Sequence, residues 1–137
     1  MNKKTITRTK VKYYEVEIPN KIEDFKRWEF TSGCTTGEDF NTFSRLFKNY
    51  LKKQLPNELQ ITDYSKGHYY VSGFISDGKS FVYFSISDVR HFPAEWHTNI
   101  LIRTAKHNKD YTGGSNMFTN LESFANNVKK IIDNPDQ

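Results

Sequence analysis

Residues 67–86 read GHYYVSGFISDGKSFVYFSI, and this stretch decides the fold. Asp77 and Gly78 separate two runs of alternating side chains. An Asp-Gly pair suits a two-residue type I′ turn, because both central residues of that turn need a positive φ. The sequence therefore predicts a β-hairpin in which Ser76 lies opposite Lys79.

The two faces of this hairpin follow from the period of two along a strand. One face is almost wholly apolar, and we expect it to be the core face. Its predicted cross-strand pairs are Tyr69 with Ile86, Val71 with Phe84 and Gly73 with Val82. The predicted pairs on the other face are Tyr70 with Ser85, Ser72 with Tyr83 and Phe74 with Phe81.

The second face carries four aromatic side chains, Tyr70, Phe74, Phe81 and Tyr83, which need a cover or a partner. Within the fold, the N-terminal segment or the loop around Trp96 is left to cover them. A protein partner is another interpretation, because aromatic residues are enriched at protein interfaces. Stacking of nucleic-acid bases on Tyr and Phe is a further one.

The remaining elements follow from hydrophobic periodicity and from helix-start patterns. Thr36 with Asp39, and Thr119 with Glu122, have the spacing of capping boxes, which open helices. The expected strands outside the hairpin are residues 5–18, 58–64 and 99–105. The expected helices are a short one within residues 21–30, a long one that ends at Pro56 and a last one whose apolar face runs from Leu121 to Ile132.

Two amphipathic helices must bury their apolar stripes, and the hairpin offers one strongly apolar face. The economical arrangement is an α+β two-layer sandwich. We expect an antiparallel sheet of four to five strands with the two main helices on one face.

The length of 137 residues fits a single domain over residues 1–137, with a basic arm at about 1–12 and a frayed tail at about 134–137. The one cysteine, Cys34, excludes an intrachain disulfide and a cysteine-based zinc site. No stretch approaches the ~18 apolar residues of a membrane span. We therefore expect a cytoplasmic protein without a membrane partner.

The net charge of +4 is unevenly distributed along the chain. Residues 1–13 carry five basic and no acidic side chains, residues 14–40 carry seven acidic and three basic ones, and residues 41–53 carry four basic and no acidic ones. A basic arm and a basic helix suit an anionic partner, although solvated charged faces are common without any binding role.

Five side chains are candidates for binding an anion. Arg45, Lys48 and Lys52 share one face of the long helix, opposite its apolar stripe. Lys106 and Lys109 belong to the polar segment 106–116, whose glycine-rich end lacks the P-loop and dinucleotide-binding patterns. A turn that reverses the chain is the favoured interpretation of those glycines.

His91, His97 and His107 lie in a segment rich in titratable residues. A small metal-dependent hydrolase would need a histidine base and a carboxylate-bound ion, with the three imidazoles close together. The spacing of His91 and His97 does not suit a zinc pair on one helix face, and no HExxH motif occurs. We predict no catalytic residue, no metal and no cofactor, and keep this hydrolase as an alternative.

These observations favour a small non-enzymatic binding module whose partner is a protein or a nucleoprotein. A nucleic-acid-binding protein that uses the basic helix and the aromatic face is an alternative. Fifteen Lys against five Arg, with twelve Asn, indicate an AT-rich coding genome. An accessory protein of a bacterial phage or plasmid, such as an inhibitor of a host defence nuclease, would suit this size and composition, and the oligomeric state stays open.

Overall fold

The computed structural model of the protein describes residues 10–11, 14–15, 17–30, 37–89 and 95–134. Five antiparallel strands form one sheet, in the spatial order β3-β4-β5-β6-β7. The strands are β3 (Gln60–Lys66), β4 (Val71–Ser76), β5 (Phe81–Ile86), β6 (Ile100–Ala105) and β7 (Met117–Thr119). The helices are α1 (Glu38–Gln54), α2 (Phe124–Asp133) and the short 3₁₀ turns η1 (Ile22–Arg27) and η2 (Trp96–Thr98).

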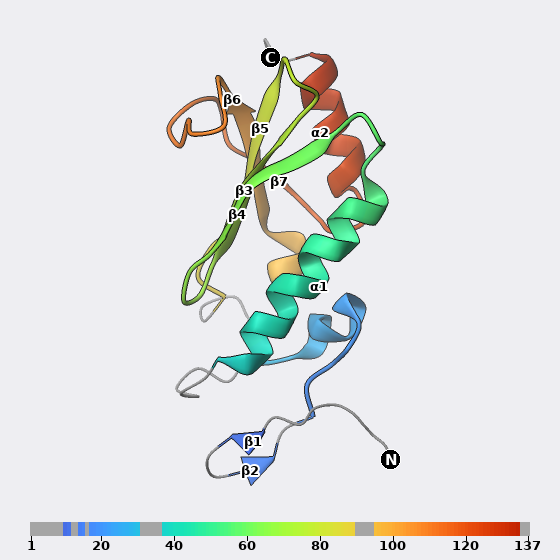
Figure 1. The fold of residues 1–137 in the computed structure, drawn as a ribbon, viewed down its shortest axis with the longest axis vertical. Helices are drawn as coiled ribbons and strands as arrows, with labels where there is room; N and C mark the ends of the chain where they lie inside the picture. The colour runs from blue at the N-terminus through green and yellow to red at the C-terminus, as the bar shows by residue number, and fades with distance from the viewer. Residues whose placement is uncertain (1–9, 12–13, 16, 31–36, 90–94, 135–137) are drawn as a thin grey trace.

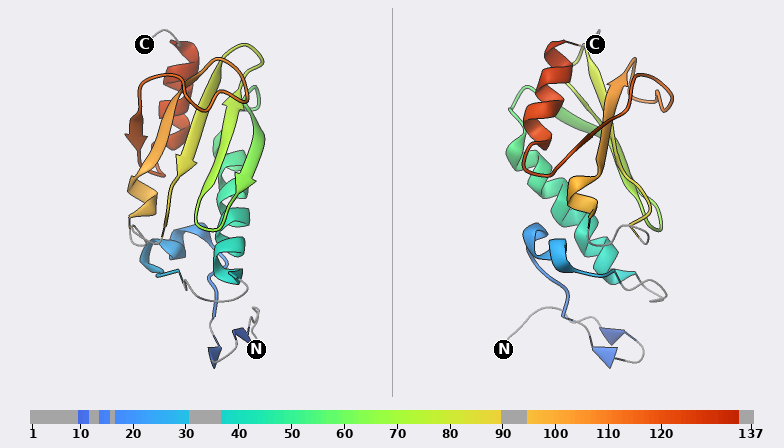
Figure 2. Two further views of the ribbon diagram at one scale, coloured as in Figure 1. Left: turned by 90° about the vertical axis from the view of Figure 1, so that its left-hand side faces the viewer. Right: turned by 180° about the vertical axis from the view of Figure 1, so that it is seen from behind.

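Both main helices lie against the same face of this sheet, as Figures 1 and 2 show. The ring of Phe84 on β5 lies 6.2 Å from Phe47 of α1 and 5.7 Å from Phe124 of α2, measured between centroids. One side chain of the sheet therefore contacts both helices. The predicted α+β sandwich is confirmed, and the sheet surface opposite the helices is named the far face.

The hairpin of β4 and β5 keeps its predicted faces but not its predicted pairs. Ser76 pairs with Phe81 rather than with Lys79, so residues 77–80 form a four-residue loop. The carboxylate of Asp77 accepts hydrogen bonds from the backbone N–H groups two and three residues later, at 2.9 and 2.8 Å, which stabilises this longer loop. The register shift is two residues, so every side chain stays on its predicted face.

Both helices begin later than the capping boxes predict. The residue before α1 is Gly37, which has a φ of 59° and no side-chain cap, while Thr36 lies outside the described residues. Thr119 ends strand β7, and α2 starts after Ser123. The Thr119 hydroxyl instead accepts a 2.7 Å hydrogen bond from the side-chain amide of Asn127, which anchors the first turns of α2 to the strand.

The N-terminal segment does not add the predicted long strand to the main sheet within the described residues. β1 (Lys10–Val11) and β2 (Tyr14–Glu15) pair with each other as a separate small sheet beyond the N-terminal end of α1 (Figure 1). Residues 1–9, which hold most of the predicted basic arm, and residues 135–137 of the predicted tail lie outside the described part. Among the described helices, none has the length and apolar character needed to cross a bilayer.

Trp96 packs in the core between η1 and α1, not over the far face. Its side chain is buried, with the ring centroid 4.7 Å from that of Phe43. Its indole N–H donates a 3.1 Å hydrogen bond to the carbonyl oxygen of Phe25. The Trp96 side chain therefore does not cover the four predicted aromatic residues, because it joins η2 to the helical layer, and residues 90–94 of its loop lie outside the described residues.

Candidate functional site

The strand register arranges the far face as three rows of cross-strand neighbours. The first row is Gln60, Ser76, Phe81 and Ala105. The second is Thr62, Phe74, Tyr83 and Arg103. The third is Ser65, Ser72, Ser85, Leu101 and Phe118, and it crosses all five strands.

The segment from Lys106 to Asn116, which we name the strap, crosses the far face over the second row (Figure 2). Its Tyr111 ring packs edge-on against Phe74 at 5.3 Å and against Tyr83 at 5.8 Å between centroids. The guanidinium of Arg103 lies 4.3 Å from the centre of the Tyr83 ring and donates a hydrogen bond to the Tyr111 carbonyl. The strap is thus the cover of the aromatic row.

The strap is attached at the opposite edge of the sheet through Asp63 of β3. A bulge lies between Thr62 and Ser65, and Asp63 within it has a φ of 51°. The carboxylate of Asp63 accepts a 2.6 Å hydrogen bond from the Asn108 amide and lies 3.4 Å from the ammonium group of Lys109. Desolvation raises the pKa of Asp63, but these contacts outweigh it and lower that pKa.

Inside the strap, Asp110 fixes the turn of the chain. Its carboxylate accepts hydrogen bonds from the backbone N–H groups of Lys106 at 2.9 Å and Thr112 at 3.1 Å. These two bonds lower the pKa of Asp110 below its ordinary value. Gly114, with a φ of 74°, lies directly against the backbone of Thr104, so the strap is packed onto β6 through a residue without a side chain.

The strap closes much of the predicted aromatic surface. Phe74 is fully buried, and Phe81 and Tyr83 are half-buried. Tyr70 alone of the four predicted residues is exposed, at 44%. Stacking of a base on the face of Phe74 is therefore blocked, and the sequence missed this because the cover comes from a segment without hydrophobic periodicity.

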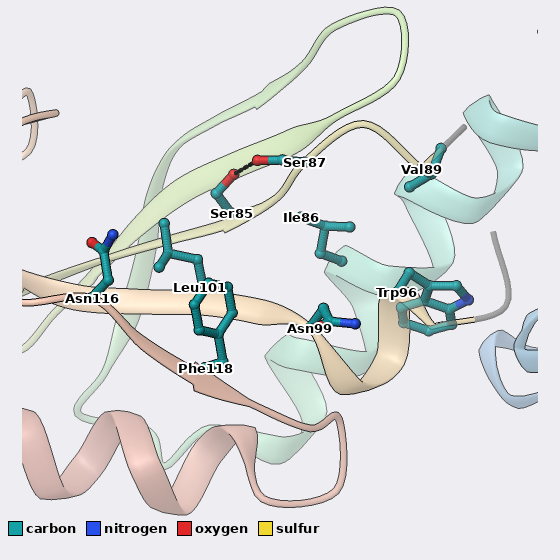
Figure 3. Close-up of a pocket in the computed structure, with 9 residues that line it drawn as sticks. All are labelled: Ser85, Ile86, Ser87, Val89, Trp96, Asn99, Leu101, Asn116 and Phe118. Carbon is teal, nitrogen blue, oxygen red and sulfur yellow. Dashed lines mark hydrogen bonds between the residues drawn. The ribbon is translucent and has the colours of Figure 1, made fainter. Parts of the chain in front are cut away.

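An apolar hollow of about 330 Å³ lies beside the strap, at the β7 end of the far face (Figure 3). Leu101 and Phe118 stand next to each other on its wall, and Ser85 and Asn116 supply polar groups. No charged side chain is among the described residues that line it. The Phe118 ring is 62% exposed, which is the largest exposure of a bulky apolar side chain in the described part of the chain.

Phe118 is a functional candidate that sequence reasoning missed. The capping-box pattern assigns Thr119 to the start of the last helix, whereas residues 117–119 form an edge strand. Of the four bulky apolar side chains exposed in the described structure, three come from residues 111–118: Tyr111, Met117 and Phe118. The sequence did contain one signal for this edge strand, namely the short apolar run Met117-Phe118 that follows Gly113 and Gly114.

The predicted cationic residues form two separate groups rather than one site. Arg45 and Lys52 are exposed on α1, and the Lys48 ammonium lies 5.1 Å from the centre of the Tyr64 ring. Lys106 and Lys109 belong to the strap, on the other side of the sheet. The sheet itself separates the two groups, so they cannot bind one small anion together.

His97 and His107, the two described histidines of the predicted three, do not converge. His97 lies in η2, before β6, and His107 follows the end of the same strand. Six residues of strand separate their ends by about 16 Å at ~3.3 Å per residue, so the two imidazoles cannot share a metal ion. His91 lies outside the described residues, and no cluster of three or more metal-binding side chains occurs in the part that the structure describes.

Comparison of the chain with family models, curated proteins and solved structures finds no match. Function therefore has to be inferred from the chemistry of the far face, the hollow and the charged surfaces.

Proposed function

We propose that the protein is a non-enzymatic binding module that takes a protein partner at the β7 end of the far face. The observation that carries this proposal is the exposed Phe118 ring on the wall of an apolar, uncharged hollow. Protein interfaces concentrate their binding energy in a few aromatic and aliphatic side chains that fill such pockets. A partner side chain in the hollow would be desolvated against Leu101 and Phe118.

The chemistry of the hollow favours a protein over a nucleic acid at this position. Nucleic-acid binding depends on cations that contact phosphates, and the described lining carries none. The Phe118 ring is instead of the kind enriched at protein interfaces, and Ser85 and Asn116 supply groups that can form hydrogen bonds with a polypeptide.

Strand β7 indicates how such a partner is held. Met117 and Phe118 are neighbours on this edge strand, so their side chains point to opposite faces of the sheet, and both are exposed. A partner strand that pairs with β7 would cover both side chains and add backbone hydrogen bonds. An apolar residue of that strand would then lie above the hollow.

The test compares the proteins that the purified protein retains from cells of its source with those retained by two variants. Phe118→Ser removes the exposed ring at the hollow, and Tyr70→Ser removes an exposed ring from the turn between β3 and β4. We expect one protein to bind to the wild type and to Tyr70→Ser, and to be lost from Phe118→Ser. Equal retention by Phe118→Ser, confirmed by calorimetry with the purified partner, would contradict the proposal.

The identity of the partner, including a host defence nuclease, and the origin in a mobile genetic element stay predictions from composition.

A further inference from the structure

A second surface lies along the seam between α1 and the edge strand β3. The two elements are joined there by the Tyr64 hydroxyl, which donates a 2.8 Å hydrogen bond to the carbonyl oxygen of Ser44. Burial raises the pKa of Tyr64 to about 12, so this hydroxyl keeps its proton at neutral pH. This hydrogen bond therefore holds α1 against β3 along the seam.

Four basic side chains follow this seam: Arg45, Lys48 and Lys52 on α1, and Lys66 on β3. The three helical residues are three and four positions apart, so they share one side of α1 and extend over about 10 Å at 1.5 Å per residue. The Lys66 ammonium lies 5.2 Å from the centre of the Phe40 ring, in the first turn of the same helix. These four residues are the cationic ridge.

Two of the four ridge cations, Lys48 and Lys66, are positioned by aromatic rings, and this contact does not neutralise them. The aromatic rings beneath Lys48 and Lys66 attract their ammonium groups without cancelling the charge. Within the described residues, no acidic side chain forms an ion pair with a ridge residue. Three lysines outside the ridge do have acidic partners. Within the described residues, Lys26 pairs with Glu122, Lys109 with Asp63 and Lys129 with Asp133.

We propose that the cationic ridge binds the phosphate backbone of a nucleic acid. Charge complementarity is the basis: a row of cations without acidic partners in the described structure matches a row of phosphates, and Arg and Lys are the residues that supply such contacts. β3 and β7 are the opposite edges of the sheet, so the ridge and the hollow lie apart and can be occupied together. A nucleoprotein would engage both surfaces.

The salt dependence of binding follows from the number of phosphates contacted. Each neutralised phosphate contributes about −0.9 to the slope of log K against log salt concentration for duplex DNA. A ridge of four cations gives a slope of about −3 to −4, and removal of three of them leaves a slope near −1. The affinity is expected to be measurable at low salt and independent of base sequence.

The experiment measures fluorescence anisotropy of a labelled DNA duplex, and of a single strand of the same sequence, over a series of salt concentrations. The ridge variant is Arg45→Gln/Lys48→Gln/Lys52→Gln. Its matched control removes the same charge from exposed positions outside the ridge and outside the strap, Lys21→Gln/Lys79→Gln/Lys130→Gln. We expect the ridge variant to lose at least tenfold in affinity for its preferred strand form, and the control to lose less than threefold.

Lys48→Gln removes a packing contact, so each variant is checked by thermal unfolding. The double variant Arg45→Gln/Lys52→Gln changes only exposed side chains and keeps the test valid if the triple variant unfolds. Phe118→Ser should bind the duplex like the wild type, because the hollow is a separate surface. If no protein partner binds at the hollow, the inference about the ridge is therefore not affected.

Three results would overturn the inference. The first is undetectable binding of both duplex and single strand at low salt. The second is an equal loss of affinity in the ridge variant and in its control, since this would reflect net charge alone. The third is equally tight binding of heparin with the same salt slope, because the ridge would then recognise any polyanion rather than a nucleic acid.

Discussion

Gly114 is a residue at which the strap packs tightly against the backbone of the sheet. A Cβ atom at this position would lie 2.4 Å from the Thr104 hydroxyl oxygen and 2.6 Å from its carbonyl oxygen. The φ of 74° adds a conformational penalty for any residue with a side chain. We expect Gly114→Ala to lower the free energy of unfolding by about 2–3 kcal/mol, measured by urea denaturation.

Gly37 provides the control for this substitution. It also has a positive φ, 59°, but a Cβ there would meet nothing within 4 Å. Gly37→Ala should therefore lose only the conformational part, about 1 kcal/mol. Equal losses for the two alanine variants would show that the strap can move away from Thr104 without cost.

Single residues also show where sequence reasoning stops. The alternation of β4 places Phe74 on the far face, and the structure confirms that placement. Its burial depends on Tyr111, which comes from a distant part of the chain. The alternation of side chains along a strand predicts which face each side chain occupies. It contains no information about a loop that comes later in the chain and crosses that face.

At the scale of elements, the strap depends on the ionised carboxylate of Asp110. Backbone N–H bonds lower the native pKa of Asp110, so its contribution to stability is complete above the unfolded value of about 3.9. That contribution is lost as the pH falls through the lowered native pKa. We expect the amide NMR shifts of Lys106 and Thr112 to follow one titration with a midpoint below about 3.9.

Asp110→Asn should remove this titration and loosen the strap at neutral pH. The two carboxylate oxygens serve different N–H donors, and an asparagine has only one carbonyl oxygen to accept them. Asp133→Asn is the control, because Asp133 is an exposed carboxylate that pairs with Lys129 within α2. A midpoint at or above about 3.9 in the wild type would contradict the role given to Asp110.

The elements themselves were predictable to different degrees. α1 has apolar residues at helical spacing and stops before Pro56, so its extent was largely visible in the sequence. The loop after Ser76 was misread because Asp-Gly suits a two-residue turn, whereas the Asp77 carboxylate stabilises four residues. The strap has no periodicity, since its shape depends on Asp110 and on the close approach of Gly114.

On the scale of the whole molecule, Phe47 joins the two layers. Its ring contacts Phe84 on β5, Phe124 on α2 and Trp96 on η2, and it is fully buried. Phe47→Ala should reduce the free energy of unfolding by about 3–5 kcal/mol. Unfolding should remain a single transition when followed by far-UV circular dichroism and by tryptophan fluorescence, because neither layer is stable without the other.

Phe118→Ala is the matched comparison, since it removes the same ring from an exposed position. Its expected loss is within about 0.5 kcal/mol. Two separate transitions in Phe47→Ala, with the helices lost before the sheet, would show that the layers fold independently.

The fold class could be predicted from the sequence, and the candidate surfaces only in part. Apolar stripes on two helices and one apolar hairpin face require a two-layer packing. Arg45, Lys48 and Lys52 were recognisable from their spacing on a helix. The hollow was not, because it is formed by residues of β5, β6 and β7, of η2 and of the segments between them, which meet only in the folded chain.

The bulge at Asp63 also determines how this sheet can grow. It interrupts the backbone ladder at the β3 edge, where side chains of the strap hold it in place, and such interruptions prevent a further strand from pairing. Strand β7 has no irregularity in its described pairing. Two copies joined through β7 would each present a blocked edge to the outside, so strand pairing between copies would end at a dimer and could not continue into a fibre.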